Sequence, residues 1–227
     1  MKQHLKRLAA PKTWAVKRKT SKFITRPLPG GHTLEMSMSV STILRDLLKV
    51  ADTARESKMI VKNKNVLVDS KKVVEPRYPV GIMDSLTLAD VKQSYRMLIT
   101  QRGKLYLAPS TDAEMKVCRV SSKTLLPGGK MQIGLHDGRS MIVTSKDYST
   151  GDSVLIKTPS QELVSHIKLE KKAQVYMIGG KHIGKLGIVE DVLGQKLVIK
   201  IGSDVVETLK KFAIVIGKEK ILLDLKV

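Results

Sequence analysis

The sequence of 227 residues contains a single cysteine, Cys118. One cysteine cannot form an internal disulfide, and it cannot provide the paired thiolates of a cysteine-based zinc site. Cys118 lies in the alternating segment Lys116–Val120, where a small buried apolar residue is expected, and no base stands near it in the sequence. We therefore interpret Cys118 as a packed thiol and not as a nucleophile. A reducing compartment, the cytoplasm, is the expected location.

Aromatic residues and long apolar runs are also scarce. Aromatics make up only 4% of the chain, so an extended platform of stacked single-stranded bases is poorly supported. A membrane span needs roughly 18 consecutive apolar residues, and the sequence has no such run. The five histidines are scattered one to a segment, which favours neither a metal site nor a catalytic histidine. We expect no metal, no cofactor, no membrane and no small-molecule substrate.

Acidic residues are few, since 21 Asp and Glu stand against 41 Lys and Arg and leave a formal net charge of +20. Such a surplus repels itself in the free protein, but it becomes favourable when a polyanion binds and releases its counterions. Nucleic acid is the leading candidate for that polyanion. The hydrophobic content of 42% is enough for folded cores, so the length predicts several small domains and not a disordered basic tail.

The first 26 residues hold nine Lys or Arg residues and no acid. We predict that residues 1–35 form a basic arm, disordered when free and ordered by RNA. Trp14 in this arm could stack on a base, or it could anchor the arm in an apolar groove, and packing is the favoured alternative. Besides Trp14, the candidate RNA contacts of the arm are Lys2, Lys6, Arg7, Lys12, Lys17, Arg18, Lys19, Lys22 and Arg26.

Two helices are predicted after the Pro- and Gly-rich segment 26–32. Apolar residues recur at helical spacing over 40–51 and indicate an amphipathic helix. Thr53 and Glu56 then form a capping box, in which the Thr53 hydroxyl accepts from the third helical amide and Glu56 reaches back to the Thr53 amide. Three cations follow at steps of three and four residues, which is typical of a solvated helix face but also of a phosphate-binding one. They are Arg55, Lys58 and Lys62.

The segments Arg55–Lys58 and Val66–Lys71 together resemble the small RNA-binding domain of ribosomal S4 proteins, pseudouridine synthases and some aminoacyl-tRNA synthetases, over about residues 41 to 90. In that family two antiparallel helices pack on a short strand pair, and basic residues of the second helix and the next loop grip the RNA backbone. Asp69-Ser70 stands where the family has an Asn-Gly turn, and Lys64 where it often has glycine. The resemblance implies RNA contacts at Arg55, Lys58, Lys62, Lys64, Lys71 and Lys72.

Beyond Ser85 the sequence changes to short alternating segments, which predict a β-rich region with a compact sheet or small barrel. Asp137-Gly138 is a favoured two-residue hairpin turn. Pro127–Lys130 lacks the spacing of a phosphate-binding loop and is interpreted as an ordinary turn.

The segment Gln174–Val192 resembles a KOW motif, which pairs strands around a glycine-rich loop in a small barrel and often turns that loop toward RNA. An ordinary glycine-rich hairpin is the alternative. The resemblance places Gly180, Gly184 and Gly187 at the motif's glycine positions and Lys181, His182 and Lys185 as RNA contacts.

Taken together, the opening segment His4–Trp14, the S4-type domain, the β-rich middle and the KOW segment resemble one family throughout, the S4e ribosomal proteins of archaea and eukaryotes. The implied fold is α+β and multidomain. After the arm come a small RNA-binding domain over 36–90, a β-rich central domain over 91–170, and an SH3-like KOW β-barrel with a C-terminal tail over 171–227.

The implied function is that of a structural constituent of the small ribosomal subunit, which supports translation and contacts small-subunit ribosomal RNA and neighbouring ribosomal proteins. The alternative is a non-ribosomal RNA-binding factor. An RNA-modifying enzyme would need a catalytic domain after residue 90, and no such site is found there. A KOW-type transcription factor would need a NusG-like domain before the motif, and the sequence lacks one. We therefore expect a binding protein and not an enzyme.

Overall fold

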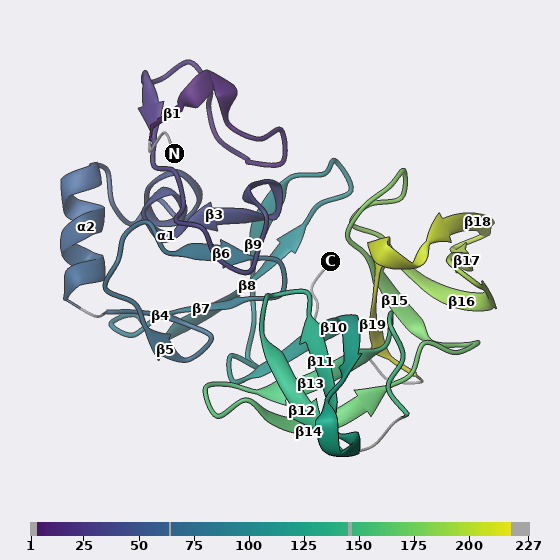
Figure 1. Cartoon of the computed structure of the whole chain (residues 1–227). Coiled ribbons are helices and arrows are strands. Elements are labelled where there is room, and N and C mark those ends of the chain that lie inside the picture. The colour runs from purple at the N-terminus through teal and green to yellow at the C-terminus, as the bar shows by residue number, and fades with distance from the viewer. Residues whose placement is uncertain (1–3, 64, 145–146, 219–227) are drawn as a thin grey trace. The chain divides into compact units, whose positions relative to one another are not determined.

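The computed structural model describes residues 4–63, 65–144 and 147–218. The described chain is mostly β, with few helices and several antiparallel sheets (Figure 1). The protein contains both helices and strands, as expected, but strands make up more of it than the prediction of two helices indicated. Two of the expected RNA contacts, Lys2 and Lys64, lie outside the described residues.

The described residues form two compact units. The first holds the chain up to Ile99 together with Gly103–Glu114, and the second holds Thr100–Arg102 and the chain from Met115 onward. We expected the first folded domain to end at residue 90. The structure differs because two strands that follow residue 90 pair with the sheet of the first unit.

The N-terminal segment is folded in the structure, whereas we expected an arm that orders only on RNA. Its strand β1 (Leu5–Lys6) pairs antiparallel with β2 (Phe23–Ile24), and the short helical turn η1 (Arg7–Ala9) follows β1. Arg7 is buried, and its guanidinium donates to the carboxylate of Asp46 in the first unit. One of the cations that we assigned to phosphates thus holds the segment in place.

Trp14 packs inside the first unit, which is the alternative that we favoured. Its side chain is only 1% exposed. The indole Nε1 donates to the Leu34 carbonyl at 3.3 Å, and the Leu105 amide donates to the Thr13 carbonyl at 2.7 Å beside it. The ring is therefore not at the surface, where stacking on an RNA base would require it to be.

The first predicted helix is only partly α-helical. It begins as α1 (Val40–Thr42) and continues as the π-type turn η3 (Ile43–Leu47), in which the Leu48 amide donates to the Ile43 carbonyl at 2.9 Å. It ends because Lys49 adopts a left-handed φ of 55°. The apolar spacing nevertheless places the expected side chains inward, since Val40, Ile43, Leu44 and Ala51 are buried.

The second predicted helix, α2 (Ala54–Lys62), begins at the expected cap. The Thr53 hydroxyl accepts from the Glu56 amide at 3.2 Å, as predicted. The Glu56 carboxylate, however, accepts from the Asp52 amide at 3.0 Å and not from the Thr53 amide. On the inner side of the helix, Ser57 is buried and its hydroxyl lies 2.8 Å from that of Ser41.

The sheet of the first unit has five strands in the order β5-β4-β7-β8-β9. A separate pair, β3 with β6, lies in the same unit. The strands are β3 (Ser37–Ser39), β4 (Val66–Val68), β5 (Lys71–Lys72), β6 (Pro79–Gly81), β7 (Ser85–Leu88), β8 (Gln93–Ile99) and β9 (Leu105–Pro109).

The β4–β5 turn uses Asp69 and Ser70 in place of the Asn-Gly pair of the resembling family. Both residues are left-handed, with φ values of 48° and 61°, as a two-residue hairpin turn of the primed type requires. The Asp69 carboxylate accepts from the Ser85 amide at 3.0 Å and so ties the turn to β7. This side-chain bond offsets the strain that a non-glycine residue has at positive φ.

The second unit contains a five-stranded sheet in the order β12-β11-β10-β13-β14, as predicted for a β-rich region. The β11–β12 hairpin forms where Asp137-Gly138 predicted it, but its loop is longer than the expected two-residue turn. The Gly138 amide donates to the Leu135 carbonyl at 3.2 Å, and of Asp137 and Gly138 only Gly138 has a positive φ, of 81°. The segment Pro127–Gly129 is an ordinary turn, η4, between β10 and β11. The strands are β10 (Met115–Leu125), β11 (Met131–Leu135), β12 (Ser140–Val143), β13 (Ser153–Lys157) and β14 (Glu162–Ile167).

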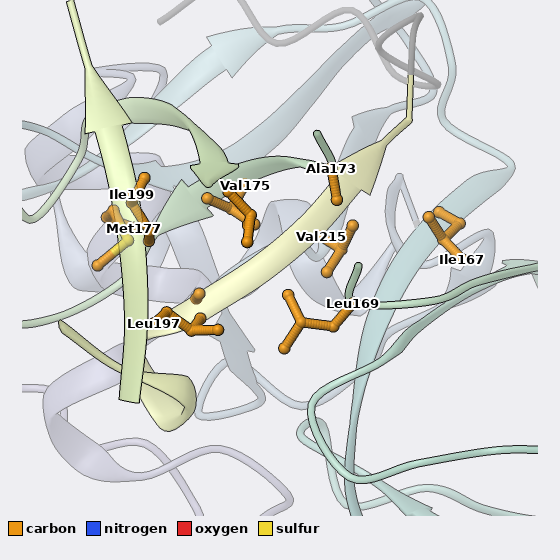
Figure 2. Packing of buried hydrophobic residues seen from close by; sticks show 10 residues of the cluster. Ile167, Leu169, Ala173, Val175, Met177, Leu197, Ile199 and Val215 are labelled. Atoms are coloured by element: carbon orange, nitrogen blue, oxygen red, sulfur yellow. The ribbon is translucent and has the colours of Figure 1, made fainter. Parts of the chain in front are cut away.

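A second five-stranded sheet in this unit has the order β18-β17-β16-β15-β19, so the last strand returns to pair with the first. Val175, Leu197 and Val215 are fully buried in its core, which Figure 2 shows in close-up. The elements are β15 (Gln174–Met177), β16 (Leu186–Leu193), β17 (Lys196–Ile201), β18 (Asp204–Leu209), the turn η5 (Lys210–Phe212) and β19 (Ala213–Gly217).

Candidate RNA-binding surface

The outer face of α2 carries the three cations that the sequence placed there. Arg55, Lys58 and Lys62 are all exposed, while Ser57 and Val61 on the opposite side are buried. None of the three cations makes an ion pair with another described residue. Their charge is therefore directed to solvent, where an external phosphate can reach it.

A cleft of about 580 Å³ lies beside this face of α2. Lys58 and Lys62 line one part of it, and Arg77 lines another. The Arg77 guanidinium donates through Nε to the Arg26 carbonyl at 3.1 Å, which holds its side chain at the cleft. Sequence reasoning did not find Arg77, because its proximity to α2 arises only when the chain folds back. The other lining residues are Thr25, Ser41, Ala54, Val74, Glu75 and Pro76.

Two further expected contacts, Lys71 and Lys72, form the strand β5. Both are exposed, and β5 is an edge strand of the sheet of the first unit. Lysines on an edge strand also protect the sheet from unwanted pairing with another sheet.

The cations of the N-terminal segment divide into two groups. Arg18 donates to the carbonyls of Leu8, Ala10 and Pro11 at 3.0, 2.7 and 2.8 Å, so its guanidinium serves the loop that contains it. Arg7 likewise donates to a side chain of the same unit, that of Asp46, and Arg26 is half-buried. We expected these arginines to contact RNA phosphates. Arg7 and Arg18 instead bond within the fold, because a guanidinium has several N–H donors that can reach backbone carbonyls and carboxylates. The exposed cations are Lys6, Lys12, Lys17, Lys19 and Lys22.

The glycine-rich loop between β15 and β16 is a tight reversal. Gly180 and Gly184 have φ values of 82° and 76°, which glycine adopts without strain. Gly187 serves close packing instead, because a Cβ there would lie 2.4 Å from Cγ2 of Ile199. Of the three side chains expected to contact RNA from this loop, Lys181 is exposed, whereas His182 and Lys185 are half-buried.

Charged side chains are also buried in the second unit, around Asp137. Lys116 Nζ lies 2.9 Å from Asp137 Oδ2, with both side chains 2% exposed, and Arg139 Nε lies 3.3 Å from the same oxygen. Burial alone would raise the pKa of Asp137, but the charges of Lys116, His136 and Arg139 and the hydrogen bond from Lys116 outweigh it and lower the pKa. Lys116 and Asp137 thus lie in the interior of the second unit.

Cys118 belongs to the same cluster and behaves as the sequence predicted. It is fully buried, and its Sγ donates to Asp137 Oδ2 at 3.4 Å. Burial raises the pKa of the Cys118 thiol well above its usual value. A thiol that stays protonated is a poor nucleophile, so Cys118 is a packing residue.

The described residues contain neither a metal-binding cluster nor a membrane-spanning helix. Within residues 4–63, 65–144 and 147–218, no group of three or more His, Cys, Asp or Glu side chains is arranged to hold a metal ion. None of the helices in this described part combines the length and the apolar character needed to cross a bilayer.

Comparisons with known proteins identify the family. The model of ribosomal family S4e matches residues 91–163. The small ribosomal subunit protein eS4 of Methanocaldococcus jannaschii is 38% identical over 99% of this chain and 98% of its own length. The eS4 protein of Methanocella arvoryzae is 41% identical over 95% of this chain and 94% of its own. The chain belongs to ribosomal family S4e.

Two further matches agree with this family. The RS4NT domain model matches residues 1–35, the same bounds as the predicted basic arm. The crystal structure of the 30S ribosomal protein S4e from Thermoplasma acidophilum superposes with a TM-score of 0.72 at 30% identity, and it covers 81% of this chain and 96% of that one. The family predicted from the sequence is thereby confirmed.

Proposed function

We propose that this S4e chain is a structural constituent of the small ribosomal subunit that binds ribosomal RNA and catalyses no reaction. The observation that carries the proposal is the near full-length identity to relatives named small ribosomal subunit protein eS4. The net charge of +20 supports the same conclusion, because a protein with this surplus is stabilised by a polyanion. Its partners are the small-subunit RNA and the ribosomal proteins next to it, and its place is in the cytoplasmic ribosome.

The outer face of α2 and its cleft are the proposed centre of the RNA contact in the first unit. Arg55, Lys58 and Lys62 would bind phosphates, and Arg77 would add a cation from the other part of the cleft. Phosphate contacts fix the position of a protein on RNA, and an A-form helix is read mainly by its shape. The support is geometric: Arg55, Lys58 and Lys62 are exposed on one helix, and Lys58, Lys62 and Arg77 line the same cleft.

The sheet at the end of the chain is proposed to be a KOW module with an SH3-like barrel. The return of β19 to β15 and the left-handed glycines of the β15–β16 loop support this proposal. In it, Lys181 at the tip of the loop contacts RNA, while His182 and Lys185 support the loop from their half-buried positions. The alternative is an ordinary glycine-rich hairpin that does not contact RNA. In that case Lys181→Ala would leave the RNA affinity unchanged.

The test is sucrose-gradient sedimentation of lysate from the native source, with each fraction probed for this protein at low and at moderately high salt. Near-stoichiometric comigration with small subunits at both salt concentrations is expected. Recovery at the top of the gradient would overturn the proposal and favour a non-ribosomal RNA-modification or transcription factor. A protein held in the subunit by ribosomal RNA should be freed when that RNA is degraded. Nuclease treatment should therefore move this protein out of the subunit fractions.

A further inference from the structure

The N-terminal segment turns one aromatic ring outward while it buries the other. Trp14 is 1% exposed, but Phe23 is 50% exposed. The Phe23 ring lies with its centroid 5.9 Å from that of His4 at an interplanar angle of 49°, and the Lys22 Nζ lies over it at 5.5 Å from its centroid. The outward aromatic thus has a second ring and a cation beside it.

The strand pairing explains why Phe23 faces solvent. In the β1–β2 pair, Leu5 lies opposite Ile24 and Lys6 lies opposite Phe23. Ile24 is buried at 5% exposure, so the Leu5–Ile24 side of the pair faces the unit. Because successive side chains of a strand alternate between faces, Lys6 and Phe23 share the opposite, outer side.

The surroundings of Phe23 favour an anionic partner. Lys6, Lys19 and Lys22 are exposed in the same segment. The sequence has no Asp or Glu before Glu35. A single exposed apolar side chain is ordinary on a protein surface, but an aromatic ring among cations matches the two parts of a nucleotide, a π-face and a phosphate.

We propose that Phe23 stacks on an unpaired nucleobase of RNA, with His4 beside the same base and Lys6 and Lys22 on the adjoining phosphates. This site rests on the proposed RNA binding and adds to it a base contact at Phe23, beside lysines that we expect to contact phosphates. Lys22 has a long flexible side chain, so its ammonium can move from the ring to a phosphate when a base arrives.

The rival occupant is an apolar patch of another protein. Leu8 in the same segment is 68% exposed and would join Phe23 in such a contact. The two occupants differ in what they need from residue 23: a base requires a flat aromatic ring, whereas an apolar protein surface accepts a leucine of similar bulk. Conservative variants at this position can therefore separate them.

The first experiment measures binding of the full chain to two labelled probes of equal phosphate count. One is an oligoadenylate of about twelve nucleotides, within the usual size of single-strand sites, and the other is the same backbone without bases. Phe23→Ala and Phe23→Leu should weaken adenylate binding by at least about fivefold, which corresponds to about 1 kcal/mol per stacked base. Phe23→Tyr should retain the affinity, and the baseless probe should not distinguish the variants.

Leu8→Ala is the matched control, since it removes a more exposed apolar side chain of the same segment. It should leave adenylate binding unchanged. Retained adenylate affinity in Phe23→Leu, or equal losses on both probes, would overturn the stacking proposal. If Phe23→Ala and Leu8→Ala both reduce incorporation into small subunits while adenylate binding is unaffected, the occupant is a protein and the proposal is wrong.

A second measurement uses Phe23→Trp. Trp14 is the only native tryptophan and is buried, so its emission provides a constant background. Stacking of adenine on the new exposed indole should quench its fluorescence, and the baseless probe should not. Absence of quenching at saturating adenylate would overturn the proposal. Wild-type comigration with small subunits is measured separately, so failure of this site and failure of the ribosomal function are distinguishable.

Discussion

The guanidinium of Arg7 donates to the carboxylate of Asp46, 39 positions further along the chain. The two side chains are 4% and 13% exposed, and Asp46 also accepts from Arg45 at 3.0 Å. This contact joins the N-terminal segment to the turn η3. A cation that sequence reasoning assigned to RNA is therefore part of the internal structure of the first unit.

Arg7→Ala should destabilise the first unit by roughly 3 kcal/mol, because it leaves a largely buried carboxylate with only Arg45 as its partner. Urea unfolding of the full chain, followed by circular dichroism, would measure this change. Lys6→Ala is the matched control, since it removes a neighbouring but exposed cation and should change stability by less than about 0.5 kcal/mol. If both variants weaken RNA binding equally and neither affects stability, Arg7 is an RNA contact after all.

The buried cluster around Asp137 predicts a specific acid sensitivity. The pKa of Asp137 is lowered below 3.8 in the folded protein, so its contribution to stability is present above that value and is lost as the pH falls through the folded pKa. Asp137→Asn removes the carboxylate charge that Lys116 and Arg139 both contact, and it should cost about 3 kcal/mol near neutral pH.

The difference between wild type and Asp137→Asn is the quantity to follow, because effects of acid on the rest of the chain are common to both proteins. Urea unfolding from neutral pH down to below pH 3.8 should show this difference shrinking as Asp137 becomes protonated. A difference that stays constant over the whole range would mean that the carboxylate charge does not stabilise the fold.

The α2 face should contribute more to RNA binding than its charge alone accounts for. Replacing Arg55, Lys58 and Lys62 together by alanine should weaken binding to small-subunit ribosomal RNA and reduce the salt slope by about three. The control removes the same charge from exposed lysines of the second unit, Lys157, Lys168 and Lys200. Filter binding across a salt series measures both triple variants. Equal losses would mean that the α2 face has no special role.

Gly187 should be required for packing and not for backbone freedom. Gly187→Ala would bring a Cβ to 2.4 Å from Ile199 Cγ2 and 3.0 Å from the Lys200 carbonyl oxygen, and such overpacking costs about 1 to 3 kcal/mol. Gly194→Ala is the comparison, since its φ is 58° but its Cβ would meet no atom within 4 Å. Its cost should be limited to about 1 kcal/mol of backbone strain. Thermal unfolding of both variants would rank them, and a smaller cost at Gly187 would contradict this packing role.

Features that depend on neighbours in the chain were predictable from the sequence. The cap at Thr53, the start of α2 and the Asp137-Gly138 hairpin each involve residues a few positions apart, so local propensity decides them. The net charge and the family resemblance are also properties of the sequence, and the S4e family was confirmed. The α2 cations were predictable as one face for the same reason, because helical spacing alone aligns them.

The identity of the residues that remain free for RNA was decided by the tertiary structure. The amino-acid sequence shows a basic segment with one tryptophan. It does not show that Trp14 donates to the Leu34 carbonyl and forms a β-bridge with Leu105, or that the β1–β2 pairing leaves Phe23 facing solvent. Arg77 likewise reaches the α2 cleft only through folding. Composition and local spacing predicted a protein that binds a polyanion. Contacts between distant positions decided which cations are used inside the fold and which remain exposed, because burial depends on the residues that the folded chain brings together.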